Sequence, residues 1–253
     1  MGTGQPRTGV PDPSGEHLLV LARGPEGYSR LSATIADAHL ARGTKGELCL
    51  TLEALSEVHR GSWQILTGCR KGSVNQALLS GGPRAARRAL DQLISAFGRD
   101  QVAVELWDHG HPLDSSRNDA LAEIAVAAKV DLVATNNVHY ATASSFALAN
   151  TLSAIRAQRP LSELQGWLAP APTAQLRSEA EQQRRFARWP GVVDRSAEIG
   201  RDCAFDLSLV APQLPDFPVP EGFTEQTYLA HLAEVGATKR YGPRNNPTLP
   251  RAW

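Results

Sequence analysis

The sequence predicts an α/β fold in which short buried strands alternate with helices. Short apolar runs, which are typical of strands covered on both faces, recur along the first half of the chain. Between them lie stretches whose apolar residues repeat at the three- to four-residue period of an amphipathic helix. This alternation indicates parallel βα units, arranged either as an open sheet or as a barrel.

Four stretches are expected to form the strands. HLLVLA and SWQILTG are apolar runs, and QVAVELW alternates between strongly apolar positions and their neighbours. DLVATNN follows a helical stretch and completes the set. The expected strands are therefore residues 17–22, 62–68, 101–107 and 131–137.

Helices are expected between these strands and after them. Leu31 and Ile35 fall on one helical face, and Pro83 marks the start of a helix because proline fits the first helical turn. After Tyr140 the strand signals stop. The expected helices are residues 27–41, 51–59, 83–97, 118–130, 143–158 and 178–189.

The last part of the sequence reads differently. Residues 210–222 are rich in proline, which is typical of a stiff, extended linker. A short amphipathic piece follows at residues 224–242.

Composition excludes several classes of protein. The 253 residues are 42% hydrophobic and 21% charged, as in ordinary globular proteins, and the formal net charge is zero. This balance argues against strong non-specific binding of nucleic acid through bulk charge. The sequence contains neither an apolar run that approaches a membrane span nor a signal peptide. Cys49, Cys69 and Cys203 are far apart, so a reducing cytoplasm is expected rather than a disulfide framework.

Several side chains of the metal-ligand type follow the expected strands. In parallel α/β folds, functional residues gather at the carboxyl ends of the strands, where Cys69, His109, His111 and His139 lie. Thiolate and imidazole groups suit zinc. Each residue also has an ordinary alternative role. A histidine after a strand is more often a hydrogen-bonded turn residue, and a cysteine beside glycine is more often a small buried residue.

Two basic stretches and a glycine-containing turn suggest binding less strongly. RAARR (84–88) and RRFAR (184–188) lie in expected helices, so a solvated helix face is favoured over a nucleic-acid contact. GCRKG lacks the spacing of a phosphate loop, and we expect Gly68 and Gly72 to serve a tight turn.

Five stretches, taken in order, resemble a known family. They are HLLVLARGPEGYSRLS, LTGCRKG, VELWDHGHPLDSSRNDAL, LVATNNVHY and FDLSLVAPQLPDFPVPEG. The set resembles the polymerase-and-histidinol-phosphatase (PHP) domain of bacterial C-family DNA polymerases, the DNA polymerase III alpha subunits, and most of all their error-prone type. The resemblance covers about residues 9–245.

The resemblance implies the later part of a distorted β/α barrel of the PHP type, followed by a helical segment and a proline-rich linker. Residues 1–15 would be a loop and residues 16–145 the partial barrel. The helical segment would then occupy residues 146–209, and residues 210–253 would hold the linker and the start of the polymerase palm.

The resemblance also implies metal ligands at His17, Cys69, position 137 and His139. The family pattern has Asp where this chain has Asn137, and a neutral amide supplies no charge to offset a divalent ion. The family's earlier ligands, an HxH pair, an Asp, a His and a Glu, are absent upstream of residue 17. A zinc or manganese site is therefore expected only in degraded form.

The implied function is that of a fragment, truncated at both ends, of an error-prone DNA polymerase. The parent would add nucleotides to DNA during damage-tolerant synthesis, with magnesium held by acidic residues of the palm and with DNA and replication or translesion proteins as partners. We expect no catalytic residue and no polymerase activity in this chain alone. Two alternatives stay open: a free-standing metal-dependent phosphoesterase of the PHP type, and a non-catalytic interaction module.

Overall fold

The structure is a computed structural model that describes residues 16–41, 50–164, 171–210 and 217–242. The expected loop at residues 1–15 and Cys49 lie outside the described residues. The chain divides into two compact units, Met1–Val210 and Ala211–Trp253, and each is described by itself.

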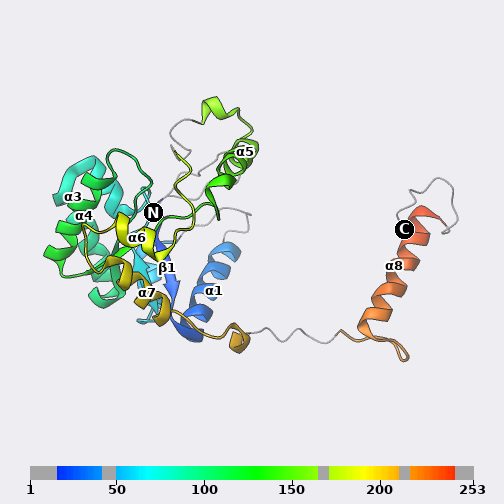
Figure 1. The fold of residues 1–253 in the computed structure, drawn as a ribbon. Helices are drawn as coiled ribbons and strands as arrows, with labels where there is room; N and C mark the ends of the chain where they lie inside the picture. The colour runs from blue at the N-terminus through cyan, green and yellow to red at the C-terminus, as the bar shows by residue number, and fades with distance from the viewer. Residues whose placement is uncertain (1–15, 42–49, 165–170, 211–216, 243–253) are drawn as a thin grey trace. The chain divides into compact units, whose positions relative to one another are not determined.

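The first unit is built on a four-stranded sheet. Its strands are β1 (Leu19–Ala22), β2 (Trp63–Leu66), β3 (Val102–Leu106) and β4 (Asp131–Ala134), and they lie side by side in chain order (Figure 1). Each strand falls within one of the four expected stretches. The predicted mixed α/β fold is therefore confirmed.

The orientation of the first strand corrects the sequence prediction. β2, β3 and β4 are parallel, but β1 is antiparallel to β2, with Leu19 opposite Leu66 and Ala22 opposite Trp63. Two helices, instead of one, separate β1 from β2, so the chain reverses twice and β2 starts beside the end of β1. Hydrophobic runs do not encode direction, and an antiparallel edge strand on a parallel sheet is common.

The larger core lies on one face of the sheet. Side chains alternate along a strand, and β3 directs Val102, Val104 and Leu106 into this core. The helices α3 (Ser73–Phe97) and α4 (Asp114–Ala128) lie side by side and supply the fully buried residues Leu90 and Leu121 (Figure 1). Each such leucine contributes about 1.5–3 kcal/mol through burial.

The opposite face carries a smaller core. Leu66, Ala103 and Val133 pack there against Ile199 of α7 (Val192–Asp202). The sequence prediction missed α7. Val192 and Ile199 are the two buried residues of this short helix, which gives too weak a periodic signal to recognise.

The remaining helices of this unit follow the expected pattern, with shifted boundaries. They are α1 (Gly24–Leu40), α2 (Leu52–Val58), α5 (Phe146–Ala157), α6 (Glu179–Arg185) and four short 3-10 turns at Arg99–Gln101, Ala143–Ser145, Leu161–Glu163 and Leu207–Val210. Helix α3 is longer than expected. Gly82, at φ 69° and ψ −170°, interrupts it just before Pro83, so the proline starts only its second part.

The second unit contains one helix, α8 (Glu225–Tyr241), among its described residues. Thr224 and Thr227 form a reciprocal capping box at its start, which satisfies backbone donors of the first turn. The helix falls within the expected amphipathic piece, and none of its described residues is buried. The expected linker lies partly outside the described residues, at 211–216, and stays a prediction.

We predict that Gly72→Ala lowers the free energy of unfolding by more than about 2 kcal/mol, because a buried overlap cannot relax cheaply. A Cβ atom at Gly72 would lie 2.0 Å from the carbonyl oxygen of Thr67. The matched control is Gly200→Ala in α7, where a Cβ meets nothing within 4 Å. This control should be stabilised by about 0.5–1 kcal/mol, the helical preference for alanine. Urea unfolding measures both, and equal effects of the two variants would contradict the packing described here.

Candidate functional site

The carboxyl ends of β2, β3 and β4 define one edge of the sheet, because these strands are parallel. Cys69, His109 and His139 follow these strands in turn. The antiparallel β1 adds His17, which precedes its strand and so lies at the same edge. Candidate residues that are distant in sequence therefore share one edge.

His17 and Cys69 are in direct contact. The Cys69 Sγ atom lies 3.4 Å from His17 Nδ1, and the His17 backbone N–H donates to the Lys71 carbonyl at 3.0 Å. His17 is exposed, and Cys69 is half-buried. Sulfur and nitrogen ligands of a tetrahedral zinc ion lie about 3.5 Å apart, so this pair matches one edge of such a site.

A rigid turn presents Cys69. Gly68 has φ +76°, and the Gly72 N–H donates to the Cys69 carbonyl at 2.8 Å. The buried Asn75 side chain donates to the carbonyl oxygens of Gly68 at 3.0 Å and of Cys69 at 3.2 Å. The expected tight turn at Gly68 and Gly72 is thus observed.

His109 lies beside His139, with ring centroids 6.4 Å apart. His109 is buried, and its Nε2 atom is 2.5 Å from the Asn136 carbonyl oxygen. Burial lowers the pKa of His109, and the hydrogen bond to Asn136 opposes this shift. Because a carbonyl only accepts, Nε2 carries the proton in this contact.

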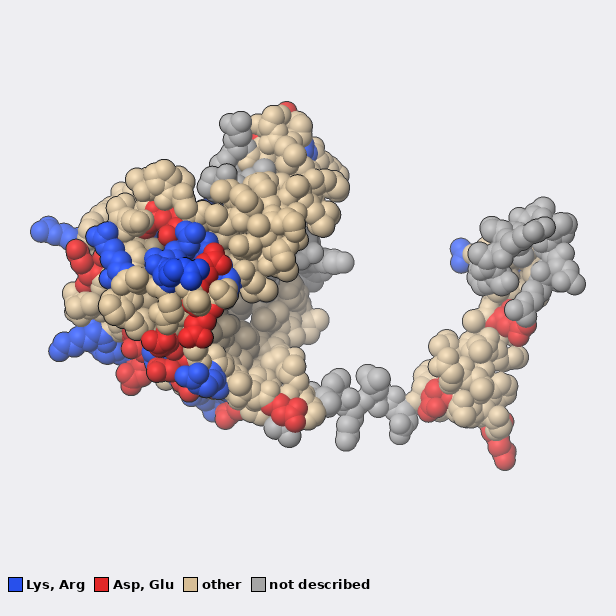
Figure 2. All heavy atoms as spheres, in the orientation of Figure 1, with Lys and Arg blue, Asp and Glu red and all other residues tan. Residues whose placement is uncertain are grey.

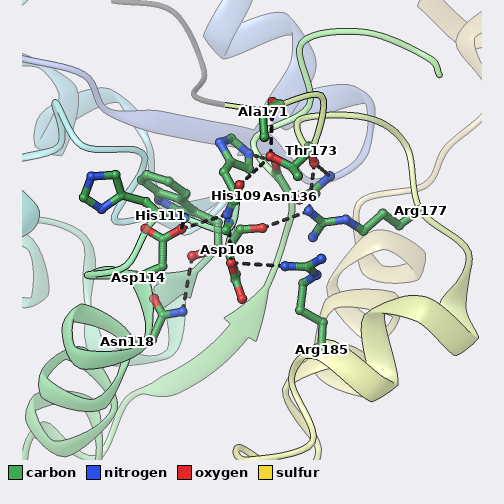
Figure 3. Close-up of polar contacts among 12 residues, drawn as sticks. Asp108, His109, His111, Asp114, Asn118, Asn136, Ala171, Thr173, Arg177 and Arg185 are labelled. Carbon is green, nitrogen blue, oxygen red and sulfur yellow. Dashed lines mark hydrogen bonds and ion pairs between the residues drawn. The ribbon is translucent and has the colours of Figure 1, made fainter. Parts of the chain in front are cut away.

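Asp114 organises the turn after β3 (Figure 3). Its Oδ2 atom accepts the backbone N–H groups of His109 at 2.9 Å and His111 at 3.0 Å. Its Oδ1 atom accepts from Arg117 at 2.6 Å, and the Arg117 guanidinium lies 3.8 Å over the Trp107 ring. His111 is exposed on this turn, so the structure favours the turn role that the sequence left open for this stretch.

Residues 171–177 cover the same turn from the other side (Figure 3). Thr173 Oγ1 donates to the His109 carbonyl at 2.5 Å. Arg177 donates to the carbonyls of Asp108 at 2.9 Å and Thr173 at 2.7 Å, and Arg185 forms an ion pair with Asp108 at 3.2 Å. Sequence reasoning missed Thr173 and Arg177, because neither lies in a motif or a periodic stretch.

The loop after β4 carries the other two predicted ligand positions. Asn137 adopts a left-handed backbone conformation, with φ 40°, which asparagine tolerates better than most residues. The His139 and Tyr140 backbone N–H groups both approach the Ala174 carbonyl, at 2.8 and 3.3 Å. The backbone of His139 therefore takes part in hydrogen bonding at the strand end.

The predicted metal ligands thus fall into two places: His17 with Cys69, and His139 beside His109. Among the described residues, no group of three His, Cys, Asp or Glu side chains is close enough to hold a metal ion. Only the pair of His17 and Cys69 fits part of a zinc site. The full set of His17, Cys69 and His139, with the neutral Asn137, stays a prediction.

Glu105 is a further polar group at this edge that sequence reasoning missed. It is the fourth residue of β3, and only 3% of its surface is exposed. Its Oε1 atom accepts from Thr135 Oγ1, and a backbone hydrogen bond from Gly68 reaches the same carboxylate. Burial raises the pKa of Glu105, and these two hydrogen bonds oppose the shift.

The basic stretches are paired with acidic side chains. Arg188 lies 2.7 Å from Asp119, and Arg87 lies 2.9 Å from Asp91. Figure 2 shows Lys and Arg side chains interspersed with Asp and Glu on the face that it presents. These contacts agree with the expected solvated helix faces.

Comparison with known proteins identifies the first part of the chain. The PHP domain family matches residues 6–109. This region belongs to the PHP domain family. The matched residues include β1, β2 and β3 with His17, Cys69 and His109.

Over nearly its whole length, the chain is similar to proteins named error-prone DNA polymerase. It is 53% identical over 247 residues to that of Mycobacterium tuberculosis, covering 98% of this chain and 22% of the relative. It is 48% identical to that of Cutibacterium acnes, covering 96% and 21%, and 34% identical to that of Corynebacterium jeikeium, covering 93% and 19%. The chain spans about a fifth of the length of these curated relatives.

These findings confirm the resemblance that the sequence predicted. The expected boundaries at residues 16–145, 146–209 and 210–253 are not tested by them and stay predictions. Among the helices of the described residues, none is long and apolar enough to span a membrane.

We predict that Glu105→Gln reduces the pH dependence of stability. The pKa of Glu105 is raised in the folded protein above its ordinary 4.5, so its stabilising contribution is present below pH 4.5 and is lost as the pH rises through the folded pKa. Glutamine does not titrate. The variant should therefore lose less free energy of unfolding than the wild type as the pH rises from 4.5, measured by urea unfolding. A pH dependence identical to that of the wild type would mean that Glu105 titrates alike in both states.

Proposed function

We propose that this chain is a segment of an error-prone DNA polymerase whose full-length form adds nucleotides to a DNA template during damage-tolerant synthesis. The observation that carries the proposal is the 53% identity over 98% of the chain to proteins of that name. The substrate of the full-length form would be DNA, and its partners would be replication and translesion proteins.

We further propose that the chain has no polymerase activity by itself and acts in the cytoplasm. Nucleotide addition needs carboxylates that hold magnesium ions around the incoming phosphates. The carboxylates described at the sheet edge serve other contacts, since Asp114 caps a turn and Glu105 is buried against Thr135. The free thiols of Cys69 and Cys203 suit a reducing compartment.

The first test of this proposal is primer extension. The purified 253-residue chain should extend no primer, because the relatives carry about four fifths of their length outside the aligned segment. A chimera of the Mycobacterium tuberculosis polymerase, with its aligned segment replaced by residues of this chain, should extend primers in the presence of magnesium.

The control is the same polymerase with its own segment. A chimera that folds and binds primed DNA but adds no nucleotide would contradict the polymerase assignment. Template-dependent extension by the isolated chain would contradict the statement that the segment alone is inactive.

A second candidate function, metal-dependent phosphoester hydrolysis, is favoured by the contact between His17 and Cys69. These two residues would hold a zinc or manganese ion together with His139, and the ion would supply an activated water. His109, neutral and buried beside His139, would orient that histidine.

We predict that purified chain binds about one zinc ion more weakly than sites with four protein ligands, as expected for three neutral or thiolate ligands without the Asp. Cys69→Ser and His139→Ala should each lower the zinc content measured by elemental analysis after dialysis. His111→Ala is the matched control, because His111 is an exposed histidine of the same edge outside the predicted set. Equal zinc content in all variants would exclude this site.

A further inference from the structure

The loops that carry the predicted ligands are separated by a strand. β3 lies between β2, whose loop carries Cys69, and β4, whose loop carries His139. Neighbouring strands lie about 4.8 Å apart, so the two loops leave the sheet roughly 10 Å from each other. A group on β3 that contacts both loops can fix their relative position.

Glu105 makes contacts with both sides. Its carboxylate receives the Thr135 hydroxyl, at the start of the loop after β4, and a backbone hydrogen bond from Gly68, the residue before Cys69. Its backbone N–H donates to Thr67 Oγ1 at 2.9 Å. One residue of β3 thus joins the ends of β2 and β4.

The Gly68 peptide is held from both ends by buried side chains. Glu105 acts on its N–H side, and Asn75 donates to its carbonyl oxygen at 3.0 Å. Asn75 and Glu105 are 1% and 3% exposed. Among the described residues, Asn75 Oδ1 and Glu105 Oε2 have no hydrogen-bond partner.

A carboxylate is a costly choice at this position for stability alone. By strand alternation Glu105 points to the face where Leu66, Ala103 and Val133 form an apolar cluster. Burying a carboxyl group costs free energy unless hydrogen bonds compensate, and an apolar side chain of similar volume is often at least as stable. Such a locally unfavourable residue indicates a role in geometry.

We propose that Glu105 is a positioning residue that holds the Cys69 turn in register with the loop that carries His139. It acts through Gly68 on one side and Thr135 on the other, and it touches no ligand itself. The inference rests on the contacts of this unit and does not depend on the polymerase assignment.

The test measures Cys69 from the far side of the sheet. In a Cys49→Ser, Cys203→Ser background, the rate constant for alkylation of Cys69 by iodoacetamide is measured across pH 6–9. Thr135→Val removes the hydroxyl that Glu105 binds, although Thr135 lies on a different loop from Cys69. The alkylation rate should rise about threefold or more, as expected for a thiol freed by the loss of one hydrogen bond elsewhere.

Three further variants separate positioning from general loosening. Glu105→Gln keeps an acceptor and should stay within about twofold of the parent rate, whereas Glu105→Leu should raise the rate at least as much as Thr135→Val. The double variant Thr135→Val, Glu105→Leu should react like Glu105→Leu alone, because both changes break one connection. Thr151→Val, which removes an exposed hydroxyl bonded within α5, is the control and should have no effect.

Two results would overturn the proposal. The first is an alkylation rate for folded Thr135→Val equal to that of the parent, which would mean that the two loops are not coupled. The second is simple additivity of the Thr135→Val and Glu105→Leu effects, which would assign each residue a separate local role. Thr135→Val keeps the shape of the side chain, so the test stands even where Glu105→Leu does not fold.

Discussion

The antiparallel pairing of β1 with β2 is the constraint on which the candidate site depends. Three parallel strands bring Cys69, His109 and His139 to one edge, but a parallel β1 would leave His17 at the opposite edge. Because Leu19 pairs with Leu66, the residue before β1 reaches the turn after β2, and the contact of 3.4 Å between His17 and Cys69 follows. The two helices between these strands are thus what makes the contact possible.

A second constraint is the demand of buried polar groups at this edge. The loops after β3 and β4 carry backbone groups that the sheet no longer pairs, and buried groups of this kind need partners. Asp114 satisfies two N–H groups of the first loop, and residues 171–177 supply donors and acceptors to both loops. The segment after α5 therefore completes the edge, although its sequence shows no regular pattern.

Much of the fold could be predicted from the sequence, because burial leaves a periodic trace. The four strands and most helices carry that trace, whereas α7, with two buried residues, does not. Strand direction leaves no trace, so reasoning from carboxyl ends finds Cys69 and His139 but not His17, which only the family resemblance indicated. Glu105 was missed because a polar residue within an alternating strand is expected to face solvent. Its burial follows from α7, which covers that face.

The separation of core and candidate site makes the site testable by substitution. The larger core lies on the face that Val102, Val104 and Leu106 share with α3 and α4, while Glu105 points to the other face. Most of the apolar burial that stabilises this unit is therefore independent of the polar contacts at the edge. Changes at Glu105 or Thr135 should shift the geometry of the edge more than they lower the stability of the fold. The same separation explains how a chain with Asn137 in place of an anionic ligand can keep its sheet, since no part of the larger core relies on a bound ion.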